Sequence, residues 1–406
     1  MDIIVQKFGG TSVGTLESRQ LVVEKILAAK KKGHSVVVVV SAIGRKGEPY
    51  ATDSLIDFVG KVNNDISTRE LDLLLSCGEI ISSVVLVGML QAVGYKAISL
   101  TGVQAGIITD GCFGSAHIVR VKPDLVTKYL KEDYIVVVAG FQGVSEDGEI
   151  TTLGRGGSDT TAAALGVALN ASVVEIYTDV NGLKTADPRI VSNPKTIDRV
   201  TYNEICQLAY EGARVIHPRA VEIAMQGNVP IKIKCTFTDE PGTLVTSSLQ
   251  PYEETTIKGD RLITGVTQIV GITQVCVDTT GLDDPCFNMK FMSKLAEEHI
   301  SIDFINVSPD RTVFTVPDGT GDKVLEIVKQ FNVDAVLRRG CAKVAVVGAG
   351  MTGVPGVMAR IVKALTLQNI QILQSADSYT TIWCLVDNRD MCAAVAALHQ
   401  EFGLGE

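Results

Sequence analysis

The chain reads Lys-Phe-Gly-Gly-Thr-Ser at residues 7–12. The apolar residues 3–5 before this stretch predict a short buried strand, and residues 15–24 after it have the composition of a helix. Two glycines between a strand and a helix let the backbone approach a ligand and turn its N–H groups inward. A helix N-terminus favours negative charge, and Lys7 adds a mobile positive charge. The stretch predicts a phosphate site, with a tight turn beside a surface lysine as the alternative. It is not a Walker loop, because the lysine precedes the glycines.

A second glycine-rich loop, Thr-Thr-Leu-Gly-Arg-Gly-Gly-Ser-Asp-Thr-Thr, occupies residues 151–161. A hairpin signal at residues 145–149 precedes it, and a helix is predicted over residues 161–169. Arg155 can bind a carboxylate or a phosphate through two parallel hydrogen bonds. Ser158 and Asp159 stand where helix caps are common, but capping does not explain the glycines and the arginine before them. The loop therefore predicts a second anion site.

Strands and helices alternate through the first 235 residues. Continuous β-branched runs such as residues 36–40 are typical of parallel strands that are buried on both faces. Strands are predicted at residues 36–40, 96–100, 107–109, 134–139, 173–178 and 231–235, and helices at residues 70–90, 123–131, 161–169, 202–211 and 220–225. This order predicts an α/β/α sandwich with a mainly parallel sheet. The glycine-rich loops follow strand C-termini, where such sheets bind ligands.

Composition limits the partners and the location of the chain. At 406 residues we expect two to three domains, and 46% apolar residues with only 12 prolines support well-formed cores. The net charge of −9 argues against nucleic acid and anionic membranes as partners. Nine scattered cysteines without a C-x-x-C pair, and no evident secretory signal, predict a cytoplasmic protein.

The pattern changes after a polar stretch at residues 246–259, which is interpreted as a linker. Two similar α+β units follow, and their helix-to-strand turns align as Glu-His-Ile-Ser-Ile at residues 298–302 and Gln-Asn-Ile-Gln-Ile at residues 368–372. The glycines at residues 348–353 match the dinucleotide fingerprint. Too few residues remain for a Rossmann domain, so they are interpreted as a structural turn of the second unit.

Five motifs together resemble the aspartate kinases. They are residues 7–12, residues 154–161, Tyr-Thr-Asp-Val at 177–180, Thr-Ala-Asp-Pro-Arg at 185–189 and His-Pro-Arg at 217–219. The two C-terminal units resemble ACT domains, so that the resemblance covers essentially the whole chain. It implies a catalytic amino-acid kinase domain at residues 1–247, a linker at 248–262, and ACT domains at 263–340 and 341–406. In the family the second ACT unit is often inserted into the first, so the segment from about Leu398 is a candidate to complete the first sheet.

The resemblance implies a monofunctional enzyme that transfers the γ-phosphoryl group of Mg-ATP to the β-carboxylate of L-aspartate. The products are 4-phospho-L-aspartate and ADP, in the first step toward lysine (through diaminopimelate), methionine and threonine. A carboxylate nucleophile is already ionised at neutral pH and needs no general base. Catalysis then consists of positioning and charge neutralisation. The alternatives are a kinase for another amino acid, such as glutamate or an acylated amino acid, and a catalytically inactive amino-acid sensor.

The resemblance also assigns roles to single residues. Lys7 bridges the phosphates, Asp159 orients it, and Arg155 takes the α-carboxylate of the substrate. The implied ATP contacts are Lys7, Phe8, Gly9, Gly10, Ser12, Tyr177, Thr178, Asp179, Leu183, Lys184, Asp187, Pro188 and Arg189, and Lys184 stands where many relatives carry a tyrosine. The implied substrate contacts are Ser41, Thr52, Glu79, Arg155, Gly156, Gly157 and Ser158. Mg²⁺ arrives with ATP and is held mainly by its phosphates, without a dedicated metal site.

Glu79 is unusual among the candidate residues, because it lies within a predicted helix that is otherwise apolar. A carboxylate that faces inward requires a cation, and by resemblance that cation is the substrate ammonium group. The alternative is a glutamate that faces solvent.

The ACT units imply feedback by an amino acid, either lysine, threonine or diaminopimelate, and a homodimer formed through these units. The candidate effector contacts are Asp303, Asn306, Ser308, Met351, Ser375 and Asp377. Residues 281–286 of the first unit depart from the Pro-Gly turn of many relatives, and this departure argues against effector binding in that unit. Residues 372–378 resemble the diaminopimelate-sensitive type of spore-forming bacteria.

Overall fold

The computed structural model describes residues 1–213, 215–247, 262–282, 284–351 and 353–405, and these form two compact units. Unit 1 consists of Met1–Lys184, Thr196–Tyr210 and Arg214–Thr256. Unit 2 consists of Thr185–Lys195, Glu211–Ala213 and Ile257–Glu406. Two short segments of the N-terminal part of the chain therefore pack with unit 2. Most of the predicted linker falls on residues 248–261, outside the described residues.

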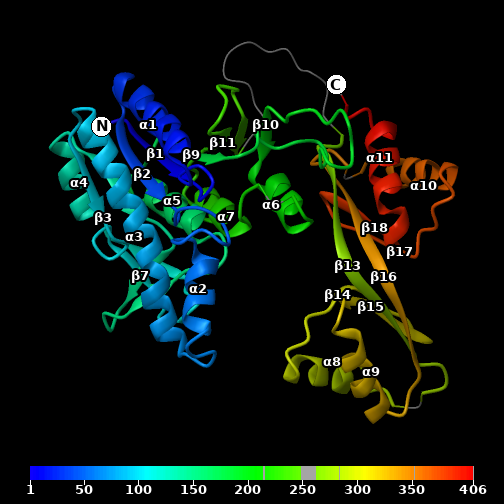
Figure 1. The fold of residues 1–406 in the computed structure, drawn as a ribbon. Helices are drawn as coiled ribbons and strands as arrows, with labels where there is room; N and C mark the ends of the chain where they lie inside the picture. Colours follow the sequence, from blue (N-terminus) through cyan, green and yellow to red (C-terminus); the bar gives the residue numbers. More distant parts are fainter. Residues whose placement is uncertain (214, 248–261, 283, 352, 406) are drawn as a thin grey trace. The chain divides into compact units, whose positions relative to one another are not determined.

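An eight-stranded sheet forms the centre of unit 1 (Figure 1), with the order β10-β12-β11-β9-β1-β2-β6-β3. All neighbouring strands are parallel except β11 and β12. The strands are β1 (Ile3–Phe8), β2 (Ser35–Val40), β3 (Ala97–Leu100), β6 (Ile135–Ala139), β9 (Val173–Thr178), β10 (Arg199–Thr201), β11 (Ile231–Cys235) and β12 (Thr243–Thr246). The five valines of β2 are fully buried, because both faces of this strand are covered.

Helices cover both faces of this sheet. They are α1 (Leu16–Lys31), α2 (Thr52–Gly60), α3 (Thr68–Ala92), α4 (Asp124–Lys131), α5 (Gly157–Ala168), α6 (Tyr202–Tyr210) and α7 (Pro218–Gln226). Phe8 packs in one core cluster with Val22 and Ile26 of α1 and Leu86 of α3. Side chains alternate along a strand, so the preceding residue, Lys7, points to the opposite face, where α5 lies. The α/β/α sandwich predicted from the sequence is confirmed.

A small four-stranded sheet, with the order β5-β4-β7-β8, also belongs to unit 1. Its strands are β4 (Ile107–Thr109), β5 (Ile118–Val121), β7 (Gln142–Ser145) and β8 (Ile150–Thr152). Strands β7 and β8 are antiparallel and form the hairpin that the sequence predicts at residues 145–149. Gly148 has a φ of 86° in the turn, a conformation that glycine adopts without strain. This hairpin leads the chain directly into the second glycine-rich loop.

Helix α5 begins four residues earlier than the sequence predicts, at Gly157 rather than Thr161. Gly156 is the N-cap with a φ of 71°, and a Cβ atom there would lie 2.3 Å from the ring of His217. The hydroxyls of Thr160 and Thr161 donate to the carbonyls of Gly156 and Gly157, as is common inside a helix. Asp159 therefore stands in the first turn rather than in a capping position.

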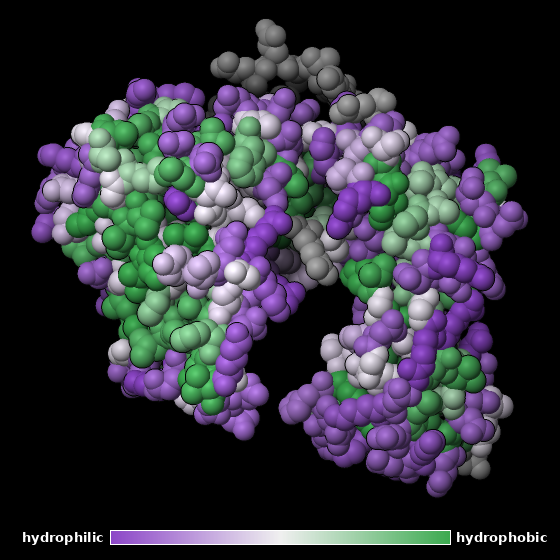
Figure 2. Space-filling model, in the orientation of Figure 1, coloured by the Kyte–Doolittle hydropathy of each residue, from purple (hydrophilic) through white to green (hydrophobic). Residues whose placement is uncertain are grey.

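Helix α3 is the one described helix that is long and apolar enough to cross a membrane. Half of its most apolar window is buried, with Leu75, Leu86 and Leu90 among the buried residues. It also carries the buried carboxylates of Asp72 and Glu79. Figure 2 shows apolar side chains gathered on the part of unit 1 where α2 and α3 lie. These helices contribute the exposed side chains of Phe58 and Val84. The partial burial of α3 and its two buried carboxylates are typical of a helix that packs in the core of a protein.

Unit 2 contains a six-stranded antiparallel sheet with the order β14-β15-β13-β16-β18-β17. Its elements are β13 (Gly265–Asp278), α8 (Phe287–Glu297), β14 (Asp303–Val307), β15 (Arg311–Pro317), α9 (Gly321–Gln330), β16 (Ala335–Val347), α10 (Val357–Leu367), β17 (Gln374–Asp377), β18 (Thr381–Asp387) and α11 (Met391–Glu401). One core packs under α8 and α9, and another packs under α10 and α11. The sequence pattern predicts strands only at residues 272–277 and 343–347 of these two elements. The central strands β13 and β16 are longer, because they pair along nearly their whole length and serve both halves.

Two expectations for unit 2 meet the structure here. Gly348, Gly350 and Gly353 follow β16, whose neighbouring strands are antiparallel, so these glycines do not form a dinucleotide-binding motif of a parallel sheet. The segment from Leu398 completes α11, and its residue Gly405 forms an isolated β-bridge with Pro194. Its described residues add no strand to the sheet, because they pack against residues 190–194 instead.

Candidate active site

The two glycine-rich loops of the sequence meet at one ion pair. Lys7 Nζ lies 2.7 Å from Asp159 Oδ1, and both side chains are nearly buried, with 12% and 13% of their surface exposed. Lys7 comes from β1, and Asp159 from the first turn of α5. The negative side chain is favourable at that helix N-terminus, and it holds the ammonium group of Lys7 beside the first loop. A phosphate at this place would meet a positioned cation.

Gly10 has no room for a side chain. A Cβ atom there would lie 2.7 Å from the carbonyl oxygen of Gly44 and 3.0 Å from that of Ala42. Gly44 N donates to Gly10 O at 3.1 Å, so the loop after β2 packs on the first glycine loop. The sequence predicted a close backbone approach at this position. In the structure the approaching group is the loop at residues 42–44, which shapes one wall of the phosphate site.

Ser12 contacts a residue that the sequence analysis missed. Its Oγ lies 2.7 Å from Oγ1 of Thr236, and both side chains are fully buried. Thr236 follows β11, and its N–H donates to the carbonyl of Thr178. The hydroxyl pair joins the loops after β1 and β11, and the backbone N–H of Thr236 links them to the end of β9. A usable signal existed, because Thr236 directly follows a predicted buried strand of the same sheet, where loops gather at the C-terminal edge.

Glu79 points inward, which rules out the alternative of a solvent-facing residue. Only 2% of its surface is exposed, and its Oε1 accepts a hydrogen bond from Ala42 N at 3.0 Å. Its Oε2 has no hydrogen-bond partner in the described part of the chain. Burial raises the pKa of this carboxyl to about 8, against the opposing effect of the Ala42 N–H group. Such a half-satisfied buried carboxyl is suited to a cationic ligand.

The neighbouring loop brings Ser41 and Thr52 toward the same helix. Ser41 follows β2 and donates from its N–H to Phe8 O, and Thr52 opens α2. A Cβ atom at Gly78 would lie 2.9 Å from Ala42 Cβ and 3.2 Å from Tyr50 O. The segment between β2 and α2 therefore wraps closely over α3 at Gly78. Among the residues that the structure describes, neither Ser41 nor Thr52 has a side-chain hydrogen bond.

Arg155 is exposed at the N-terminus of α5. Its guanidinium forms no ion pair and donates no hydrogen bond within the described ranges. Behind it, Arg219 Nη1 donates to Leu153 O at 2.9 Å, and His217 packs against Gly156. Burial and the nearby Arg219 lower the pKa of His217, which favours the neutral imidazole. His217 and Arg219 were noted as a motif but assigned no role, and in the structure they support the second glycine loop.

The predicted nucleotide contacts up to Lys184 belong to unit 1, and the others belong to unit 2. Phe8 and Tyr177 are buried, with their rings stacked at 4.7 Å, so only their backbone can reach a nucleotide at the loops that follow β1 and β9. Asp179 Oδ2 is held at 2.7 Å by Arg45, a residue that the sequence analysis missed. Leu183 is buried, and Lys184 forms an isolated antiparallel β-bridge with Thr196. Asp187, Pro188 and Arg189 belong to unit 2, where Arg189 and Asp187 form an ion pair.

Sequence comparisons define the class of this protein. A model of the amino acid kinase family matches residues 2–235, and an ACT domain model matches residues 336–400. The chain therefore belongs to the amino acid kinase family and carries an ACT domain. Within the described residues, no group of three His, Cys, Asp or Glu side chains is placed to hold a metal ion.

Individual relatives narrow the class further. The chain is 49% identical to aspartokinase 1 of Bacillus subtilis over 409 residues, with both chains covered completely. It is 40% identical to the aspartokinase of Geobacillus stearothermophilus, covering 98% of that protein. Its fold matches Escherichia coli aspartokinase III in complex with aspartate and ADP at a TM-score of 0.78, with 26% identity and 98% and 99% of the chains covered. Clostridium acetobutylicum aspartate kinase matches with the same score, 27% identity, and 99% and 100% of the chains covered. The chain is a member of the aspartokinase family.

Proposed function

We propose that this protein transfers the γ-phosphoryl group of ATP to the β-carboxylate of L-aspartate through the site around Lys7 and Asp159. The products are 4-phospho-L-aspartate and ADP, in the first step toward lysine through diaminopimelate, methionine and threonine. The observation that carries the proposal is the Lys7–Asp159 pair between two glycine-rich loops, in the same unit as the inward-facing carboxyl of Glu79. The first loop suits phosphates, and Glu79 suits the ammonium group of an amino acid.

Charge neutralisation is the main contribution that we propose for the protein. The β-carboxylate of aspartate attacks phosphorus in line with the bond that breaks, and negative charge spreads over the transferring group. Lys7 neutralises part of that charge, and Asp159 holds Lys7 in place at 2.7 Å. Gly9, Gly10 and Ser12 line the phosphate loop, and the hydroxyl of Thr236 keeps Ser12 in position.

Substrate recognition rests on two charges in this proposal. Glu79 binds the ammonium group of aspartate, and Arg155 binds its α-carboxylate through parallel hydrogen bonds. The unpartnered Oε2 of Glu79 and the unpaired guanidinium of Arg155 support these roles. Ser41, Thr52, Gly156, Gly157 and Ser158 complete the proposed substrate contacts.

The proposed nucleotide site continues along the loops after β9. In unit 1 it comprises Thr178, Asp179, Leu183 and Lys184, together with the backbone of Phe8 and Tyr177. Asp187, Pro188 and Arg189, which belong to unit 2, remain nucleotide contacts proposed from the sequence alone. Mg²⁺ is proposed to arrive with ATP, whose phosphates supply most of its ligands. When bound, Mg²⁺ withdraws charge from the phosphates, and Lys7 adds to that effect.

Hydroxylamine trapping tests the reaction directly. The full chain is incubated with Mg-ATP and either aspartate or glutamate, and ADP and hydroxamate are measured. Aspartate-dependent hydroxamate is the expected result. Turnover with glutamate alone would indicate another amino-acid kinase. Binding of lysine or threonine without any turnover would indicate an inactive sensor.

Replacing Arg155 with alanine is expected to raise the KM for aspartate by about tenfold or more, because a charge-assisted pair is lost. The KM for ATP should change little. Initial rates are measured while each substrate is varied in turn. Arg120→Ala is the matched control, because Arg120 is exposed and pairs only with the exposed Glu146. An effect confined to the KM for ATP would move Arg155 to the phosphate side.

Regulation is proposed to reside in two ACT domains, at residues 263–340 and 341–406, which follow a catalytic domain at residues 1–247 and a linker at 248–262. The two α+β halves around β13 and β16, each with its own core, support the pair of domains. A homodimer through these domains is part of the proposal, and so is a cytoplasmic location. The proposed effector is lysine, threonine or diaminopimelate.

The proposed effector contacts differ in their surroundings. Asp303, Asn306 and Ser308 lie on or beside β14, where Asp303 already pairs with Lys343 Nζ at 2.7 Å. Met351 and Asp377 line a cavity of about 470 Å³ together with Tyr379 and Ile382, and Ser375 lies on β17 nearby. The second group therefore offers the more open place for an amino acid.

Replacing Asp377 with alanine is expected to abolish inhibition by the effector and to leave uninhibited activity unchanged. The carboxylate would no longer pair with the effector ammonium group, and it contributes nothing to the catalytic unit. Activity is titrated with lysine, threonine and diaminopimelate in turn. Asp387→Ala is the control, because Asp387 lies in the same unit outside the cavity. Inhibition that persists in Asp377→Ala would place the effector elsewhere.

A further inference from the structure

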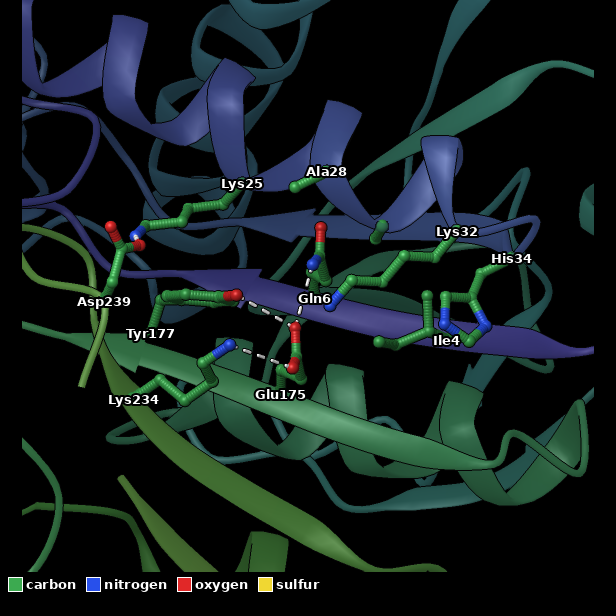
Figure 3. Close-up of a pocket in the computed structure, with 11 residues that line it drawn as sticks. Ile4, Gln6, Lys25, Ala28, Lys32, His34, Glu175, Tyr177, Lys234 and Asp239 are labelled. Carbon is green, nitrogen blue, oxygen red and sulfur yellow. Dashed lines mark hydrogen bonds and ion pairs between the residues drawn. The ribbon is translucent and has the colours of Figure 1, made fainter. Parts of the chain in front are cut away.

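Unit 1 contains a second polar cavity, of about 260 Å³, that none of the roles above uses. Figure 3 shows it over the sheet beside α1. Ile4 and Gln6 of β1, Glu175 and Tyr177 of β9 and Lys234 of β11 form its floor. Lys25 comes from α1, and Lys32 directly follows that helix as its C-cap. Gln6 and Lys7 are neighbours on β1, so their side chains leave the sheet on opposite faces. The cavity therefore lies on the other side of the sheet from the Lys7–Asp159 pair.

The floor of the cavity is a buried carboxylate held by three donors. Glu175 Oε2 accepts hydrogen bonds from Gln6 Nε2 at 2.9 Å and from the Tyr177 hydroxyl at 3.0 Å. Glu175 Oε1 lies 3.3 Å from Lys234 Nζ. Burial and the adjacent carboxylate raise the pKa of the Tyr177 phenol, so it remains a donor. These bonds fix the carboxylate in one orientation, as in a site built for a ligand.

Gln6 leaves one acceptor unused at the bottom of this cavity. The residue is 1% exposed, and its Oε1 has no hydrogen-bond partner in the part of the chain that the structure describes. The amide cannot be reversed to relieve this, because Oε1 would then face the carboxylate of Glu175. A buried amide oxygen without a donor costs free energy. A ligand that brings a donor would recover it.

One cation at the rim, Lys32, has no ion-pair partner among the described residues. Lys25 pairs with Asp239 at 2.6 Å, and His34 pairs with Asp2 at 2.7 Å. The ammonium group of Lys32 forms no ion pair within the described ranges, and in Figure 3 its side chain extends over the cavity toward Gln6 and Glu175. The cavity thus presents one free cation and one free acceptor within a single small volume.

We propose that this cavity binds a small α-amino acid as a zwitterion, at a site distinct from those of substrate and ACT effector. The ligand carboxylate pairs with Lys32, and the ligand ammonium group donates to Gln6 Oε1 and approaches Glu175. An inorganic anion would satisfy Lys32 but would leave the oxygen of Gln6 without a donor. A simple cation would be opposed by the three lysines around the cavity. A zwitterion satisfies both unused groups and leaves the net charge unchanged.

A ligand in this cavity would contact the strands that also carry the proposed active-site loops. Gln6 immediately precedes Lys7 on β1, and Tyr177 immediately precedes Thr178 at the end of β9. Lys234 lies two residues before Thr236, the partner of Ser12. The occupant would rest on the same three strands whose ends carry the proposed catalytic loops.

Hydrogen–deuterium exchange on the full chain tests the site. Glycine, alanine, serine, aspartate, lysine and threonine are added singly, with inorganic phosphate as the anion probe. We expect at least one amino acid to slow exchange in residues 25–34 and 173–178. Lys32→Glu should weaken this protection by at least about tenfold in ligand concentration, because the lost charge pair becomes repulsive. Lys31→Glu is the matched control, since Lys31 is exposed beside Lys32 but does not line the cavity.

Three results would overturn the proposal. They are equal protection in Lys32→Glu and in the wild type, protection by phosphate in place of any amino acid, and no protection of these residues by any probe at millimolar concentration. Both variants change exposed side chains at the end of α1, so thermal unfolding is expected to confirm that they fold. Protection of other regions by aspartate or by an ACT effector serves as an internal reference for intact binding elsewhere.

Discussion

Replacing Lys7 with alanine is expected to lower kcat by about two to three orders of magnitude, the size associated with the loss of one preorganised charge stabiliser. The ammonium group is held at 2.7 Å by Asp159 and is 12% exposed, so little reorganisation is needed when charge develops on the transferring phosphoryl group. The KM values should change less than kcat, because the contact strengthens in the transition state. Steady-state rates of aspartate-dependent ADP release measure the effect.

A surface pair supplies the control for this substitution. Lys30 lies 2.6 Å from Asp133, nearly the same separation, but the Asp133 side chain is 80% exposed. Lys30→Ala should leave kcat unchanged, since exposed ion pairs contribute little. Thermal unfolding of Lys7→Ala is followed in parallel, because Asp159 loses its partner. A loss in kcat below about threefold in a folded Lys7→Ala variant would contradict the role given to Lys7.

Replacing Glu79 with glutamine is expected to raise the KM for aspartate by about tenfold to a hundredfold, with a smaller change in kcat. The variant keeps the shape of the side chain but removes the charge that would meet the substrate ammonium group. Glutamine can still accept the hydrogen bond from Ala42 N, so the loop after β2 should remain in place. Glu17→Gln is the matched control, because it removes one carboxylate charge from an exposed position of α1 that does not line the site.

The pH dependence of aspartate binding gives a sharper test of Glu79. Its pKa is raised to about 8 by burial, so the free enzyme carries this carboxyl largely protonated at neutral pH. An ammonium ligand favours the ionised form, and binding should therefore release a proton. Aspartate affinity should increase with pH up to about 8. Calorimetry in buffers of different ionisation enthalpy should detect the released proton in the wild type but not in Glu79→Gln. A pH-independent wild-type affinity would contradict the assignment.

The same group makes a signed contribution to stability. Because the folded pKa is higher than the ordinary value of 4.5, the folded chain holds this proton more tightly than the unfolded chain. The contribution is present at low pH and is lost as pH rises from about 4.5 to about 8, at about 1.4 kcal/mol per unit. Glu79→Gln should therefore gain stability relative to the wild type as pH increases. Urea unfolding of the ligand-free proteins at two pH values within this window measures the difference.

Local patterns carried much of the fold. The valine run of β2 predicted a strand buried on both faces, and the first glycine-rich loop was correctly placed after a strand of the parallel sheet, whereas the second loop follows β8 of an antiparallel hairpin. The start of α5 was wrong by four residues, because Gly156 takes a left-handed conformation against His217, more than fifty residues away in sequence. The length of β13 and β16 was also missed, since only their pairing across the whole sheet keeps both strands extended.

The sequence by itself determined which chemical groups are available: Lys7 and two glycines before one helix, Arg155 and Asp159 before another, and a carboxylate within an apolar helix. These follow from composition and spacing over short stretches, where backbone preference and periodicity act. Only the tertiary structure decided that Lys7 meets Asp159, that Glu79 faces inward with one oxygen unpartnered, and that Thr236 holds Ser12. It alone brought Gln6, Glu175 and Lys32 around one cavity. Contacts between distant segments depend on how strands are ordered and which face each side chain takes, and neither is encoded in any single stretch.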